Sequence, residues 1–104
     1  MDIYTTECIP GKKTEVLGLV RGTIVQSKNI GVDFLASMKT LVGGEIKGYT
    51  DMVNQAREIA TERMLAEAAA LGADAVVCVR YGTSSVMQGA SEFIVYGTAV
   101  KIVE

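Results

Sequence analysis

Histidine and tryptophan are absent from this sequence of 104 residues, which has one proline and two cysteines. Without histidine, one chain cannot assemble a Ser-His-Asp triad, a Cys-His pair or a histidine-ligated zinc site. Positive and negative residues are nearly equal in number, since 10 Lys and Arg against 12 Asp and Glu give a formal net charge of −2. The chain also lacks a basic block, so we expect no nucleic-acid partner.

Targeting signals and long hydrophobic runs are also missing. No segment approaches the roughly 18 consecutive apolar residues of a membrane helix. The first eight residues, MDIYTTEC, lack the basic and apolar regions of a secretory signal. Cys8 and Cys78 lie in unlike segments, which gives no disulfide framework. We therefore expect a single domain over residues 1–104 that is cytoplasmic, has reduced thiols and makes no membrane contact.

The sequence is rich in apolar residues, which make up 49% of the chain and give a mean hydropathy of +0.30. Runs of β-branched residues predict strands. The expected strands are a short one over Thr5–Ile9 and long ones over Glu15–Gln26, Ala75–Gly82 and Glu92–Val103. A loop of small residues over Thr83–Ser91 would join the last two as a hairpin.

Apolar residues at helical spacing predict two helices between the first and second long strands. The first would begin near residues 30–32, carry the stripe Phe34, Leu35, Met38, Leu41 and Val42, and end at Gly43-Gly44. The second would cover Lys47–Leu71 and end before Gly72.

Small residues line one face of the second predicted helix, at Ala56, Ala60 and Ala68. We expect this face to pack closely against Gly18 and Gly22 of the first long strand. The elements together predict an α+β fold, a β-α-α-β-β unit whose antiparallel sheet carries helices on one face.

The predicted strands are apolar on both faces, whereas an antiparallel sheet with one wet face alternates apolar and polar residues. In the last strand, Phe93 and Val95 would face one side while Ile94 and Tyr96 face the other. The helices can cover one face, and we expect nothing in the chain to cover the second. A symmetric homo-oligomer would bury it.

Several short segments occur in an order and at a spacing that are typical of one protein family. They are Thr5-Thr6 with Ile9 and Gly11, Leu17-Gly18-Leu19-Val20 with Gly22, Asn29-Ile30 with Asp33 and Ala36, Val42-Gly43-Gly44-Glu45 with Tyr49, and Ala56-Arg57 with Ala60 and Arg63. The densest are Leu71-Gly72-Ala73-Asp74-Ala75-Val76-Val77 and Tyr96-Gly97-Thr98-Ala99-Val100. Through these segments the chain resembles the YbjQ-like bacterial family over nearly its whole length.

This resemblance implies a fold like the dodecin subunit, assembled as a ring-shaped homopentamer. It makes the Thr5–Ile9 segment a candidate for pairing between subunits, because an exposed strand edge readily adds another strand. The family is often labelled "putative heavy-metal-binding". That label requires ligands, and the chain has no histidine, no Cys-x-x-Cys and no clustered acidic triplet.

The candidate metal ligands are therefore the thiolates of Cys8 and Cys78, which suit a soft metal ion. Ring symmetry would repeat Cys8 five times if it lay near the axis. Cys78 lies among valines, where a cysteine also serves as a small core residue. Both interpretations stay open for Cys78, and Cys8 is either a ligand or a reduced thiol without a metal.

Two further groups of residues are candidates for binding. Gly43-Gly44-Glu45 is either an anion-binding nest or a hinge between helices. Arg80, Tyr81 and Glu92 could line a cofactor cleft between subunits. No nucleophile–base pair can be assembled, so we expect no enzyme.

Two functions thus remain from the sequence. The first is a homo-oligomeric binding or storage protein of unknown ligand, metal-binding by family label only. The alternative is a small-molecule or cofactor binder at subunit clefts, by analogy with the dodecin-like fold.

Overall fold

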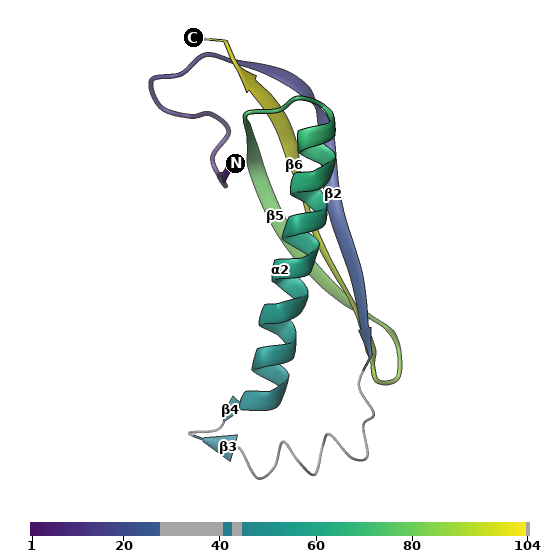
Figure 1. Cartoon of the computed structure of the whole chain (residues 1–104). Helices are drawn as coiled ribbons and strands as arrows, with labels where there is room; N and C mark the ends of the chain where they lie inside the picture. The colour runs from purple at the N-terminus through teal and green to yellow at the C-terminus, as the bar shows by residue number, and fades with distance from the viewer. Residues whose placement is uncertain (28–40, 43–44, 104) are drawn as a thin grey trace.

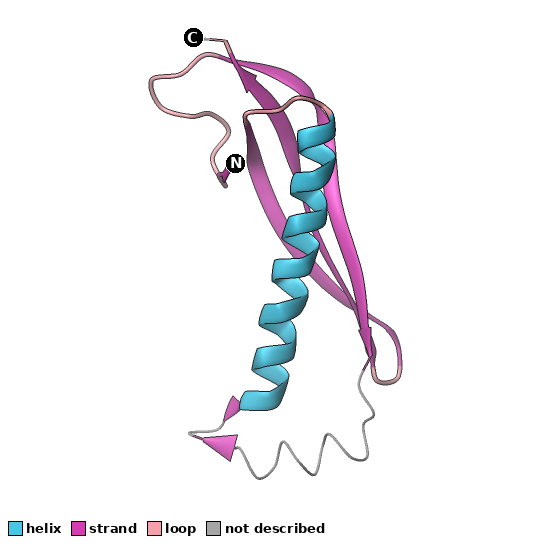
Figure 2. Cartoon of the chain, viewed as in Figure 1, coloured by secondary structure: helices cyan, strands magenta, loops and turns pink. Residues whose placement is uncertain are grey.

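Three long strands and a long helix make up most of the protein (Figure 1). The structure is a computed structural model, and it describes residues 1–27, 41–42 and 45–103. The four-stranded sheet has the order β1-β5-β6-β2. Its strands are β1 (Asp2–Ile3), β2 (Thr14–Ser27), β5 (Ala75–Met87) and β6 (Ala90–Ile102). Helix α2 (Lys47–Ala70) runs along one face of this sheet (Figure 2). Strands β3 (Leu41–Val42) and β4 (Glu45–Ile46) form a separate small sheet.

The α+β class with a helix on one face of a sheet is confirmed. The three long strands are antiparallel, as expected, but β1 pairs with β5 in parallel, so the sheet is mixed. The first predicted helix lies outside the described residues except at its end. There Leu41 pairs with Ile46 in a strand, so the prediction that the helix extends through Leu41 and Val42 is wrong. Local strand pairing satisfies the backbone at these residues, which helical spacing alone did not reveal.

The N-terminal segment runs beside β5 without forming the strand predicted over Thr5–Ile9. Beyond β1, the Tyr4 amide donates to the Val76 carbonyl at 2.8 Å and the Cys78 amide donates to Thr6 at 3.0 Å. Ile9 is only 8% exposed and packs in a cluster with Ala75, Val77 and Val100.

This cluster lies on the sheet face opposite α2. The expectation that nothing in the chain covers the second face is therefore wrong at this end of the sheet. A non-local contact of an irregular segment has no periodic signal in the sequence, which is why the strand analysis missed it.

The β5–β6 hairpin is longer than predicted. Strand β5 continues to Met87 and β6 begins at Ala90, so only Gln88 and Gly89 remain in the turn, with Gly89 at φ +80°. The predicted loop over Thr83–Ser91 is wrong, because pairing with β6 draws its small polar residues into the sheet.

A bulge in β5 changes which residues share a face. The register shifts between Val77 and Arg80, and Cys78 has φ +56°, a conformation that residues other than glycine rarely adopt. Val77 and Cys78 both contact the cluster on the second face, while Val79 joins Val76 in the core under α2. The two-residue alternation of a regular strand is therefore broken beyond Val77.

Helix α2 begins as predicted and lies on the sheet through its small residues. Ala56, Ala60 and Ala68 are buried together with Met64. A Cβ atom on Gly22 would stand 1.8 Å from the Ala60 carbonyl oxygen and 2.6 Å from the Met64 nitrogen. The close approach expected at Gly22 is thus present.

Gly18 has a different role from the one expected. The nearest atom to a Cβ there is the Leu71 side chain at 4.0 Å, so no helix backbone lies against it. Its φ of +148° and the register shift between Val16 and Gly18 show that this glycine serves a bulge in β2.

Side chains of α2 also bind the free edge of β2. Glu67 Oε1 accepts a hydrogen bond from the Arg21 amide at 3.1 Å, and Arg63 Nη1 donates to the Thr23 carbonyl at 2.7 Å. Backbone groups of an edge strand otherwise remain open to another strand. The helix therefore blocks β2 at these two residues.

We predict that Gly22→Ala lowers the free energy of unfolding by about 3 kcal/mol or more, because the added methyl group would overlap helix backbone. Gly82→Ala is the matched control, since its nearest contact would be Ile94 Cγ2 at 3.4 Å. We expect the control to change stability by less than about 1 kcal/mol. Urea unfolding at one fixed protein concentration measures both. Equal stability of the two variants would contradict the close contact.

Candidate functional site

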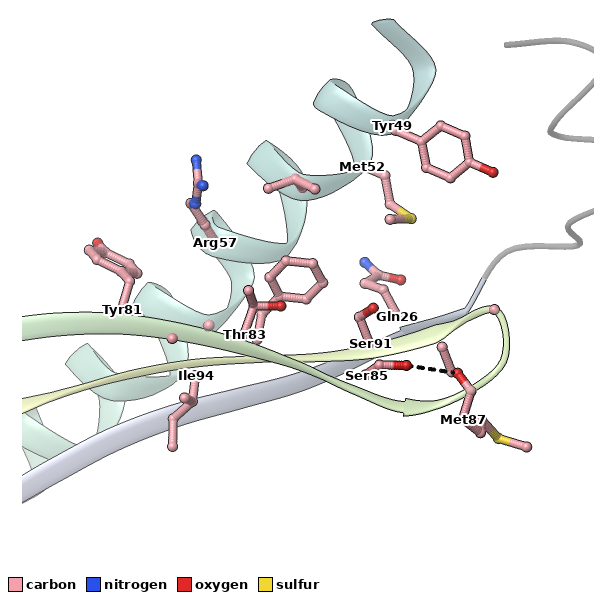
Figure 3. A pocket seen from close by; sticks show the side chains of 16 residues that line it. Gln26, Tyr49, Met52, Arg57, Tyr81, Thr83, Ser85, Met87, Ser91 and Ile94 are labelled. Carbon is pink, nitrogen blue, oxygen red and sulfur yellow. Dashed lines mark hydrogen bonds between the residues drawn. The ribbon is translucent and has the colours of Figure 1, made fainter. Parts of the chain in front are cut away.

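A cavity of about 530 Å³ lies between the N-terminal half of α2 and the end of the β5–β6 hairpin (Figure 3). At Gly22 the helix rests on the sheet, but toward its N-terminus it diverges from the strands (Figure 1). The alanines of the contact region give way to larger residues there, Tyr49, Met52 and Val53. These side chains and the hairpin enclose the space.

The base of the cavity is apolar. Phe93 is 6% exposed, and Ala60 and Ala90 are also buried. Met52 and Val53 of α2 lie opposite them and are half-buried. An apolar ring or chain would therefore lose its contact with water here, which is the main source of affinity in small-molecule sites.

Strand β5 supplies a row of hydroxyl groups. Tyr81, Thr83 and Ser85 lie at alternate positions, so their side chains share the face toward α2. Ser91 of β6 is the register partner of Ser85 and adds a fourth hydroxyl. In Figure 3, Thr83 and Ser91 rise from the strands toward the helix, whereas the Ser85 hydroxyl points along the hairpin, where it donates to the Met87 carbonyl at 3.4 Å.

One hydrogen-bonded chain links the two walls of the cavity. The hydroxyl oxygens of Tyr81 and Thr61 are 3.1 Å apart, and Thr61 Oγ1 lies 2.7 Å from the Arg57 carbonyl oxygen. Arg57 and Thr61 are one turn apart on α2, so their side chain and carbonyl can meet. The contact between the two hydroxyls then holds the Tyr81 ring against the helix.

Arg57 is the only charged residue among the described residues that line the cavity. Its side chain is exposed, and within the described ranges its guanidinium makes no hydrogen bond or ion pair. The Arg57 guanidinium therefore keeps its positive charge and its N–H donors free for a ligand at this end of the cavity.

The three predicted cofactor residues lie on different faces of the sheet. Tyr81 lines the cavity, whereas Arg80 Nη1 donates to the Thr5 and Val79 carbonyls at 3.1 and 2.9 Å. Glu92 pairs with Ser84 on the face turned away from α2. A role for Arg80 and Glu92 in a cleft between subunits stays a prediction.

The two predicted metal ligands lie in segments that adjoin each other. Cys8 is exposed and Cys78 is half-buried, and both are free thiols. The bond from the Cys78 amide to Thr6 places the segment of Cys8 beside the β5 bulge. Over residues 1–27, 41–42 and 45–103, no group of three Cys, Asp or Glu residues could hold a metal ion. Metal binding by either thiol stays a prediction.

Sequence reasoning missed most of the cavity. The lining residues it did not single out include Met52, Phe93, Thr83 and Ser85. The available signal was the alternation of polar residues after Tyr81, which is typical of a strand face. The other members come from a helix and a strand that only the tertiary fold brings together.

The fold and cavity define a class of small α+β protein, with one long helix over a mixed sheet and an apolar cavity at one end. The chain belongs to the YbjQ-like family, whose model, described as "Putative heavy-metal-binding", matches residues 1–103. The resemblance stated from the sequence is thereby confirmed.

Relatives in several bacteria match over nearly their full length. A UPF0145 protein of Clostridium novyi (strain NT) is 61% identical over 102 residues, covering 98% of this chain and 99% of that protein. A UPF0145 protein of Thermotoga maritima is 56% identical over 103 residues, covering 98% and 97%.

A solved structure supports the fold. It is a crystal structure of a protein with unknown function of the DUF74 family from Pediococcus pentosaceus, with a TM-score of 0.68 and 19% identity. The match covers 96% of this chain and 95% of that one. Among the residues that the structure describes, no helix is both long and apolar enough to cross a membrane.

We predict that a thiol reagent such as Ellman's reagent labels Cys8 at least about tenfold faster than Cys78, because Cys8 is exposed and Cys78 is half-buried in a bulge. Cys8→Ser should remove the fast phase and Cys78→Ser the slow phase. A single phase of equal rate for both thiols would contradict the placement of these residues.

Proposed function

We propose that this chain is a homo-oligomeric binding protein that holds a small organic molecule in the cavity between α2 and the β5–β6 hairpin. The cavity of about 530 Å³ carries the proposal. Its size lies within the range of small-molecule sites, and an apolar base with a few convergent polar groups is typical of them. The site lies within one chain, unlike the subunit cleft expected from the sequence.

The chemistry of the lining supports binding over catalysis. The described lining side chains include hydroxyls, one amide (Gln26) and one guanidinium, but no carboxylate and no thiol. A hydroxyl nucleophile needs a base within hydrogen-bond reach, and the partner of Tyr81 is the neutral hydroxyl of Thr61. Such groups orient a ligand without transferring a proton to or from it.

A heavy metal ion, as in the description of the family, has weaker support. The two thiols lie at the N-terminal segment and the β5 bulge rather than in the cavity, where the soft ligand atoms are the thioether sulfurs of Met52 and Met87. Neutral thioethers without a thiolate or imidazole beside them are a poor ligand set for a heavy divalent ion. An organic ligand in the cavity is therefore the function that the geometry supports best.

Self-assembly is the second part of the proposal, and the uncovered sheet face supports it. On the face opposite α2, large apolar residues of β2 remain open to solvent: Val16 is 68% exposed, Leu19 66% and Val25 54%. Tyr96 of β6 lies on the same face and is 43% exposed. Burying each side chain fully would contribute about 1.5–3 kcal/mol. A ring of five copies, which the family resemblance implies, would cover this face.

We predict that the purified protein has an oligomeric mass at micromolar concentration by light scattering. Leu19→Glu should lower that mass, because it places a charge in the buried face. Leu71→Glu is the matched control, since Leu71 is 48% exposed in the turn after α2. A monomeric wild type, or equal masses for both variants, would reject the proposed assembly surface.

We predict that 1-anilinonaphthalene-8-sulfonate binds the cavity and that Ser85→Trp weakens its binding at least about tenfold, since the indole would fill the space. Ser84→Trp is the control, because the neighbouring residue points to the opposite face. Fluorescence titration, with excitation beyond the indole absorption, measures both affinities. If both variants bind as the wild type does, the cavity is not the binding site.

A further inference from the structure

The two hydrogen bonds that link Tyr81, Thr61 and the Arg57 carbonyl can form with only one assignment of donors and acceptors. The Arg57 carbonyl can only accept, so Thr61 must donate its single hydroxyl hydrogen across the 2.7 Å contact. The oxygen of Thr61 is then the acceptor in the 3.1 Å contact with Tyr81. Tyr81 therefore donates its phenolic hydrogen to Thr61.

This direction determines what Tyr81 offers to a ligand. A phenol has one hydrogen to donate, and that hydrogen is already used on Thr61. The lone pairs of the Tyr81 oxygen remain, and no described group donates to them. A molecule in the cavity therefore meets a hydrogen-bond acceptor at Tyr81, and an O–H or N–H group of the ligand satisfies it.

Arg57, in contrast, offers hydrogen-bond donors to the ligand. Its backbone carbonyl is occupied by Thr61, but its guanidinium keeps five N–H donors and its charge. Planar carboxylates bind guanidinium groups through two parallel hydrogen bonds, which are among the stronger ones in proteins. No acidic residue competes for it among the described lining residues.

The acceptor oxygen of Tyr81 and the guanidinium of Arg57 lie at the same end of an otherwise apolar cavity. Tyr81 and Arg57 are linked through Thr61, and in Figure 3 both lie toward one end of the cavity, away from Tyr49. Phe93 and Met52 line the space beyond them. An aromatic ring fits this region, because rings pack favourably on aromatic and thioether side chains.

We propose that the cavity binds a small aromatic carboxylate that also carries a ring hydroxyl or amino group. Its carboxylate pairs with the Arg57 guanidinium, its O–H or N–H group donates to the Tyr81 oxygen, and its ring lies on Phe93 and Met52. This assignment rests on the proposed function, since it names the ligand class of the same cavity.

Three probes that differ by one group test the assignment: 3-hydroxybenzoate, benzoate and 3-hydroxybenzamide. Titrations followed by amide chemical shifts give their affinities for the full chain. We expect 3-hydroxybenzoate to bind at least about tenfold more tightly than either of the others, because each lacks one charge-assisted or donor contact.

Two variants assign the contacts to residues. Tyr81→Phe should lower the affinity for 3-hydroxybenzoate to that for benzoate and leave benzoate unchanged. Arg57→Gln should make 3-hydroxybenzoate bind no better than 3-hydroxybenzamide. Tyr96→Phe and Lys12→Gln are the controls, since they remove a hydroxyl and a positive charge outside the cavity and should change neither affinity. Circular dichroism confirms that each variant is folded.

The outcomes separate this inference from the proposed function. Equal affinity for the acid and the amide, or an equal loss for benzoate in Tyr81→Phe, overturns the assignment of the ligand class. If 1-anilinonaphthalene-8-sulfonate still binds the cavity in that case, the binding function stands. If none of these molecules binds, both proposals fail.

Discussion

The contact between the backbone of α2 and β2 at Gly22 is the constraint on which the rest of the structure depends. No side chain fits between Gly22 and the Ala60 carbonyl, so the helix backbone lies directly against the strand at this point. That contact brings Arg63 and Glu67 within reach of the β2 edge, where they bind its backbone. It also sets the helix axis, and the cavity opens where larger residues replace the alanines toward the helix N-terminus.

The two faces of the sheet consequently serve different purposes. The face under α2 combines the core with the cavity, whose hydroxyls come from alternate residues of β5. On the opposite face, Ile9 of the N-terminal segment covers one end of β5 and β6, while Val16, Leu19 and Val25 of the edge strand β2 remain exposed. Under our proposals, ligand binding and self-assembly use opposite faces. Changes at one should therefore leave the other intact.

The sequence predicted the parts of the fold that depend on local periodicity. Helix α2, the three long strands and the close approach at Gly22 follow from patterns within single segments. The bulge at Cys78 did not, because a register shift is decided by both strands and reverses the expected faces. The extension of the hairpin over Thr83 and Ser85 was not predicted for a similar reason. Pairing with β6 outweighs the weak strand propensity of small polar residues. The candidate site was harder to predict than the fold, and only Tyr81 was singled out beforehand.

Intermolecular nuclear Overhauser effects between 3-hydroxybenzoate and methyl-labelled protein test the binding site most directly. Our account predicts contacts from the probe ring to the methyl groups of Met52 and Ala90, which line the cavity. Contacts restricted to the methyl groups of Leu19 and Val25 on the opposite face, or no contacts at all, would contradict it.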